Sequence, residues 1–158
     1  MKTNTCCFFG HRTINETKDL RATINKTIEN LIVSESVDTF LFGSKSRFNS
    51  LCLEVVTEMK EKYPHITRIY VRAEFPYISE DYKKYLLESY EHTYYPEHII
   101  GAGKASYIKR NYEMITHSNF CIVYYDERIA NSPYKSGTKI ALDYATKLGK
   151  CIIRLPDK

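Results

Sequence analysis

The chain has 158 residues, of which 43% are hydrophobic and 27% charged, and its formal net charge is +4. This length and composition predict one globular domain, residues 1–158, with a core of its own. No apolar run approaches the roughly 20 residues that cross a membrane. A charge of +4 suits an anionic small molecule and is too small to point to nucleic acid by itself.

Five apolar runs of strand length alternate with helical patterns along the chain. The predicted strands are 5–9, 37–42, 66–71, 120–125 and 151–155. The predicted helices open at Thr13, then cover 48–59, a short stretch capped at Ser79, 104–117 and 137–148. This alternation predicts a three-layer, Rossmann-like α/β fold, since right-handed crossovers leave few other arrangements. We expect a five-stranded parallel sheet in the order 3-2-1-4-5, with helices on both faces.

Two segments stand out within this pattern. Thr13-x-x-Glu16 matches a capping box and predicts the start of the first helix. The stretch 72–103 is longer than most connections and rich in tyrosine, which predicts a functional loop or lid. Most of these tyrosines are expected in the core, and one or two are candidates for stacking on a base. The aromatic area of 77–95 also predicts a two-fold dimer, or a tetramer of two dimers, with this segment at the interface or over the ligand.

The five cysteines form no CxxC pair, and the histidines show no zinc-ligand spacing. We therefore expect buried, reduced thiols in a cytoplasmic protein, with no metal and no cofactor.

Small polar and basic residues follow three of the strands at the point where a helix begins. They are Gly10, His11 and Arg12 after the first strand, Gly43, Ser44, Lys45 and Arg47 after the second, and Ser136, Gly137 and Thr138 before the last helix. The carboxyl ends of parallel strands meet in one crevice, and helix N-termini favour anions. These junctions predict a site for a phosphate-bearing ligand, in which Arg12 clamps the phosphate and neutral His11 donates a hydrogen bond. A tight turn with a solvent-facing arginine is the competing explanation for 10–12.

Further candidates lie outside these junctions. Arg110 and Asn111 sit next to the apolar stripe of their helix and are expected to face the crevice. Asp126 and Glu74 each follow a strand, so either carboxylate is a candidate for catalysis or for binding ribose hydroxyls.

Three stretches together resemble the YpsA-like branch of the SLOG superfamily, which includes the LOG-type phosphoribohydrolases and the DprA-like proteins. Residues 7–12 read CFFGHR and are similar to the opening CFTGHR of that branch. Residues 109–126 are similar to its KRNRYMVDRSDLLIAVYD stretch, and 136–150 to its GGT…YA…GK stretch. The resemblance covers nearly the whole chain in matching order. It implies a nucleotide-binding Rossmann-like domain whose crevice is lined by Gly10, His11, Arg12, Gly43, Arg110, Asn111, Gly137 and Thr138.

The chain departs from the family pattern at two places. Arg47 and Asn49 stand where relatives often carry Gly and Asp, which shifts the loop toward anion binding. The phosphoribohydrolases place a Glu three residues after the Thr of their GGxGT motif, and this chain has Ala141 there, with Ser136 in place of a Gly.

We therefore expect a binder of a phosphate-containing nucleotide derivative, ADP-ribose-like or cyclic, that acts as a sensor or a sequestering protein. A nucleotide N-glycosidase of the phosphoribohydrolase type is the enzyme alternative, with Asp126 or Glu74 as its carboxylate. DNA binding of the DprA type is the third hypothesis, and the modest charge makes nucleic acid an unlikely partner.

Overall fold

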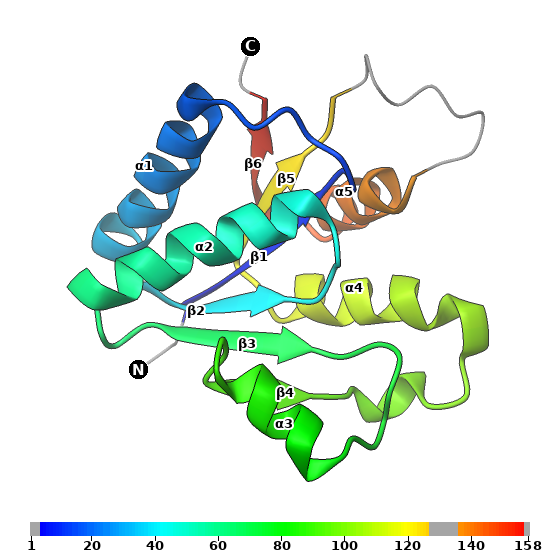
Figure 1. The fold of residues 1–158 in the computed structure, drawn as a ribbon. Helices are drawn as coiled ribbons and strands as arrows, with labels where there is room; N and C mark the ends of the chain where they lie inside the picture. Colours follow the sequence, from blue (N-terminus) through cyan, green and yellow to red (C-terminus); the bar gives the residue numbers. More distant parts are fainter. Residues whose placement is uncertain (1–3, 127–135, 157–158) are drawn as a thin grey trace.

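The computed structural model describes residues 4–126 and 136–156 (Figure 1). The strands are β1 (Asn4–Gly10), β2 (Val37–Phe42), β3 (Thr67–Val71), β4 (His92–Tyr94), β5 (Phe120–Tyr124) and β6 (Cys151–Leu155). The α-helices are α1 (Lys18–Ser34), α2 (Arg47–Lys62), α3 (Glu80–Leu87), α4 (Ser106–Thr116) and α5 (Gly137–Lys147). Two 3₁₀ turns, η1 (Glu97–Ile99) and η2 (Gly103–Ala105), precede α4. No helix of this described part has both the length and the apolar composition needed to cross a membrane.

All strands join one parallel sheet in the order β4-β3-β2-β1-β5-β6. The α/β fold and the relative order of the five predicted strands are confirmed. The sixth strand, β4, was missed because three residues are too few to show an alternating pattern. It extends the sheet beyond β3, where Ile69 pairs with His92.

Successive side chains of β1 point to opposite faces and build two cores. Cys6 and Phe8 pack into a cluster with α1 and α2, whereas Cys7 and Phe9 pack with α4 and α5. Helices therefore cover both faces of the sheet, as Figure 1 shows. Two-sided burial explains why β1 reads as an unbroken apolar run.

The first helix starts later than the capping box predicts. Thr17 is the N-cap of α1, and its side chain accepts a hydrogen bond from the Leu20 N–H at 3.0 Å. The capping-box prediction at Thr13 is wrong because the chain first runs along the start of α2, where the Arg12 carbonyl accepts from the Arg47 N–H. Glu16 is thereby left outside the helix and pairs with Arg47.

The segment 72–103 contains the predicted short helix, α3, and its N-cap is Ser79 as expected. In Figure 1 this helix lies beside β4, the strand at one edge of the sheet. Tyr77 and Tyr85 are 87% and 65% exposed, so this segment does present aromatic area on its surface. Dimer formation through it stays a prediction.

Four of the five cysteines are buried free thiols, as expected. The fifth, Cys151, is the first residue of the edge strand β6 and is exposed.

Candidate functional site

A pocket of about 480 Å³ lies at the carboxyl edge of the sheet, a volume typical of small-molecule sites. Its walls come from the ends of β1, β2 and β3, from α3, from the first turns of α4 and from the start of α5. The lining residues are Phe9, Gly10, His11, Arg12, Gly43, Ser44, Lys45, Ser46, Tyr70, Arg72, Ala73, Glu74, Phe75, Tyr82, Tyr107, Arg110, Asn111, Ser136, Gly137 and Thr138.

The structure brings every predicted ligand-binding residue except Arg47 to this one pocket. Of the two candidate carboxylates, Glu74 lines the pocket, whereas Asp126 is buried outside its lining. Ala141, at the position of the phosphoribohydrolase Glu, is 1% exposed and packs in the core between α5 and the sheet. Among the described residues, no group of three or more His, Cys, Asp or Glu side chains is arranged to hold a metal ion.

The three glycines that line the pocket differ in the space that a side chain would find at each position. A Cβ on Gly10 would lie under 3.0 Å from three atoms of the Phe48 side chain, and a Cβ on Gly43 would lie 2.8 Å from Arg110 Cδ and from Met114 Sδ. Both are therefore required by packing of the protein on itself. A Cβ on Gly137 meets no atom of the described residues within 4 Å, so these residues leave open space beside this glycine at the start of α5.

His11 is held as a neutral imidazole. Its Nε2 accepts a hydrogen bond from the Asp126 backbone N–H at 2.9 Å, which leaves the proton on Nδ1. Burial lowers the pKa of His11, and the rings of Tyr124 and Tyr125 pack against it. The side chain thus offers the pocket a donor without adding a charge.

Four cations line the pocket, and three of them already have partners. Arg110, 4% exposed, donates from Nη1 to the carbonyls of Gly43 (2.6 Å) and Val71 (3.2 Å), so it fastens α4 to the ends of β2 and β3. Burial lowers the pKa of Arg110. The Arg72 guanidinium donates to the carbonyls of Phe75 and Pro76, and Lys45 pairs with Glu74 at 3.3 Å. Through these hydrogen bonds, Arg110 and Arg72 mainly stabilise the wall of the pocket.

The fourth cation is Arg12. Within the part of the chain that the structure describes, its guanidinium has no hydrogen-bond or ion-pair partner. Arg12 is therefore the pocket cation whose charge is available to a ligand.

The start of α5 adds donors to the same pocket. The Ser136 side chain caps the helix by accepting from the Lys139 N–H at 3.1 Å. The N–H groups of Gly137 and Thr138 have no partner among the described residues, as expected for the first turn of a helix. Together with the helix dipole they favour an anion at this end of the pocket.

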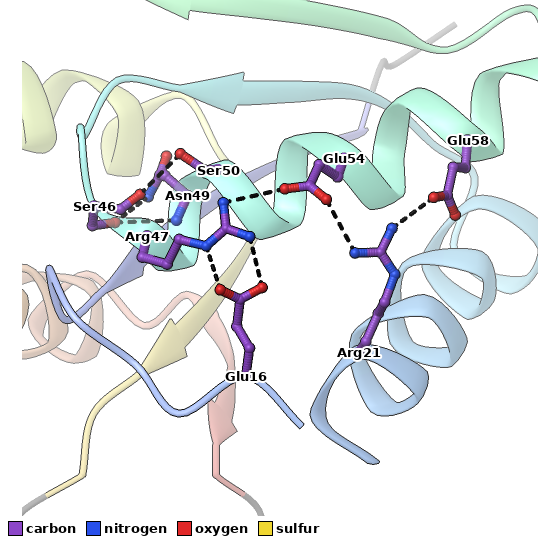
Figure 2. A network of polar contacts seen from close by, with 8 residues as sticks. All are labelled: Glu16, Arg21, Ser46, Arg47, Asn49, Ser50, Glu54 and Glu58. Atoms are coloured by element: carbon purple, nitrogen blue, oxygen red, sulfur yellow. Dashed lines mark hydrogen bonds and ion pairs between the residues drawn. The ribbon is translucent and has the colours of Figure 1, made fainter. Parts of the chain in front are cut away.

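The start of α2 differs, and Figure 2 shows why. Arg47 turns away from the pocket toward Glu16 and Glu54, which line up beside it. The predicted role of Arg47 in the crevice is thus not seen, because two carboxylates already hold its guanidinium. Asn49, 3% exposed, donates from Nδ2 to the Phe8 carbonyl at 3.1 Å and ties α2 to β1.

Reasoning from the sequence expected a functional loop over 72–103 but named no site residue other than Glu74 on one wall of the pocket. Tyr70, Arg72 and Phe75 come from β3 and the turn after it, and Tyr107 comes from the first turn of α4. A signal for Tyr107 was present, since it precedes the predicted pair Arg110 and Asn111 by three and four positions on one helix. Arg72 directly follows a predicted strand end, as Gly10 does after the first strand.

The family model described as the YspA SLOG family matches residues 2–153, almost the entire chain. The chain belongs to this family. No curated protein matches the chain. The sequence match gives the SLOG family, and the structure adds the position and lining of the pocket at the strand ends.

Two solved structures of the molybdenum cofactor carrier protein from Chlamydomonas reinhardtii are similar to this SLOG protein. One is 16% identical with a TM-score of 0.57, covering 97% of this chain and 76% of the carrier. The other is 15% identical with a TM-score of 0.55, covering 100% of this chain and 79% of the carrier. At this identity the likeness is one of fold.

Proposed function

We propose that this SLOG protein binds a phosphate-containing nucleotide derivative in the pocket and acts as a carrier, sensor or sequestering protein. The observation that carries the proposal is that Arg12 and the N–H groups of Gly137 and Thr138 meet in one pocket and have no partner among residues 4–126 and 136–156. A guanidinium together with a helix N-terminus forms a donor set suited to phosphate oxygens. His11 adds a neutral donor beside it.

A binding role is favoured over catalysis by the placement of the carboxylates. The position that carries the phosphoribohydrolase Glu is Ala141 here and is packed in the core. The similar fold of the molybdenum cofactor carrier protein, a carrier of a small molecule by its name, supports a role in holding a ligand rather than transforming it.

The test is isothermal calorimetry or a thermal shift with a panel of mononucleotides, cyclic nucleotides and ADP-ribose, because a ligand that binds only the folded state raises the melting temperature. Arg12→Ala is expected to abolish binding and to leave the unliganded melting temperature unchanged. Lys147→Ala, a cation at the far end of α5, is the matched control and should bind as the wild type does. If no compound of the panel binds, the proposal is wrong.

A nucleotide N-glycosidase remains the second candidate because Glu74 lines the pocket and its pKa is lowered by Tyr107 and Lys45, which keeps it ionised. An ionised carboxylate suits the stabilisation of an oxocarbenium-like transition state. Incubating the protein with each bound nucleotide and analysing the products by chromatography separates the two functions. Free base that appears with the wild type and not with Glu74→Gln would establish the enzyme.

A further inference from the structure

The pocket has two chemically different ends. The donors of Arg12, Gly137 and Thr138 belong to β1 and α5, whereas four aromatic side chains come from the other end, at β3, α3 and α4. These are Tyr70, Phe75, Tyr82 and Tyr107. Because only β2 lies between β3 and β1 in the sheet, the end of β1 that carries Arg12 and the end of β3 are about 10 Å apart at the usual strand spacing. An extended mononucleotide, with a base at one end and a phosphate at the other, matches such a division.

Glu74 lies among these aromatic side chains and is the one carboxylate that lines the pocket in the described part of the chain. A carboxylate repels a phosphate, so it must face a part of the ligand that donates hydrogen bonds. The position of Glu74 next to Phe75 assigns that part to the heterocycle rather than to the phosphate.

The turn that carries Glu74 is held in place. Arg72 donates from Nε to the Phe75 carbonyl at 3.1 Å and from Nη1 to Thr93 Oγ1 at 3.1 Å, so both ends of the turn are tied to the sheet. Lys45 Nζ lies 3.3 Å from one oxygen of Glu74 and 3.5 Å from the other. The Tyr107 hydroxyl donates to the same carboxylate. The carboxylate retains acceptor capacity beyond Lys45 and Tyr107, since its two oxygens offer about four lone-pair sites.

We propose that Glu74 and Lys45 read the edge of a heterocycle that presents two adjacent N–H donors followed by a carbonyl oxygen. The 2-amino and ring N–H groups donate to the two oxygens of Glu74, and Lys45 donates to the neighbouring carbonyl. Guanine (2-amino-6-oxo) and pterins (2-amino-4-oxo) both present this edge of amino group, ring N–H and carbonyl. Adenine presents one amino donor beside a ring-nitrogen acceptor, which would face a Glu74 oxygen without a proton between them.

This inference rests on the proposed function, because it names the class of base within the same phosphate-bearing ligand. The aromatic side chains provide the stacking surface that any heterocycle uses, so they set affinity. The Glu74–Lys45 pair discriminates between a base with this edge and a base without it. A bidentate contact of this kind contributes roughly 5- to 150-fold between matched and mismatched bases.

The test is calorimetry with GMP, IMP, AMP and neopterin monophosphate. We expect GMP or the pterin to bind tightest, IMP more weakly because it lacks the 2-amino group, and AMP weakest. Glu74→Gln should weaken GMP and the pterin by about 10- to 100-fold and leave AMP nearly unchanged. The tighter of GMP and the pterin identifies which source of the shared edge the pocket prefers.

Glu61→Gln, a carboxylate in the last turn of α2, is the matched control and should preserve the order of affinities. Equal binding of GMP and AMP, or an equal loss of both with Glu74→Gln, would overturn the assignment and leave the proposed function intact. Equal loss would instead indicate that Glu74 binds the ribose, which both nucleotides share. If none of the four compounds binds even to the wild type, the proposed function fails together with this inference.

Discussion

The helices α2 and α5 both begin at the pocket and both carry a serine N-cap, Ser46 and Ser136, yet their first turns serve different purposes. At α2 the Arg47 N–H donates to the Arg12 carbonyl, and the Arg47 side chain is held by Glu16 and Glu54 (Figure 2). At α5 the first two N–H groups have no partner among the described residues, and Gly137 faces open space.

The difference teaches that a glycine-rich, basic strand–helix junction does not by itself indicate a phosphate site. Gly10 sits against Phe48, the second residue of α2, so the small residue at the end of β1 serves the contact between strand and helix. Gly137 makes no such contact with any residue that the structure describes. The donors without a partner among the described residues distinguish the α5 junction, the proposed binding site, from the α2 junction, whereas the sequence pattern is alike at both.

The largest expected effect is on the structural side of this comparison. Gly10→Ala places a methyl group into the Phe48 ring, and we expect it to destabilise the fold by about 3 kcal/mol, as overpacking of a core does. Gly137→Ala is the matched control and should change the free energy of unfolding by less than about 0.5 kcal/mol. Urea unfolding followed by circular dichroism measures both. Equal stability of the two variants would remove the distinction between these glycines.

Asn49→Asp tests the contact between α2 and β1. The amide Nδ2 that donates to the Phe8 carbonyl becomes a carboxylate oxygen in a buried place, so we expect a loss of about 2 kcal/mol at pH 7. Burial against an acceptor raises the pKa of the new Asp in the folded state above its unfolded value of about 3.9. The loss is therefore smallest near pH 4 and grows as the pH rises through the folded-state pKa.

The control for this variant is Asn119→Asp. Asn119 accepts through Oδ1 from the Thr5 N–H at 2.9 Å, and a carboxylate keeps that acceptor. Urea unfolding at pH 5 and pH 7.5 should show little loss for Asn119→Asp and a loss for Asn49→Asp that is larger at pH 7.5. A loss that does not depend on pH would mean that the lost packing, not the charge, is responsible.

The two junctions also show how much of the fold and of the site can be predicted from the sequence. Strand order and pocket membership were predictable, because parallel strands place their carboxyl ends together whatever the side chains do. The role of Arg47 was not predictable, because it depends on Glu16, which lies outside α1 since that helix begins at Lys18 with Thr17 as its N-cap. The aromatic wall was missed for a similar reason, since Tyr107 reaches the pocket through the packing of α4 on the sheet. Long-range side-chain partners decide such roles, and local patterns do not contain them.

On the binding side of the comparison, Gly137→Ala is expected to weaken the nucleotide that binds the wild type by about 10-fold. The added methyl group occupies space at the N–H groups of Gly137 and Thr138, and a tenfold loss corresponds to about 1.4 kcal/mol. Calorimetry with the best ligand of the panel measures it, and Ala141→Gly, deep on the same helix, controls for a general effect on α5. Wild-type affinity in Gly137→Ala would place the phosphate elsewhere in the pocket.

The smallest expected effect comes from Arg47. Arg47→Gln should leave nucleotide affinity unchanged, because its guanidinium points to Glu16 and Glu54 instead of the pocket, whereas Arg12→Gln should lose binding. Hydrogen bonding from Arg47 lowers the pKa of Glu16, so this pair contributes stability above the unfolded carboxyl pKa and loses it as the pH falls through the lower folded value. We therefore expect a small decrease in the melting temperature of Arg47→Gln at pH 7 that disappears on acidification, since an exposed ion pair contributes little. Thermal unfolding at pH 7 and pH 3 checks the stability, and calorimetry checks the affinity. A marked loss of affinity in Arg47→Gln would make α2 a second anion-binding terminus and would remove the division between the two helices.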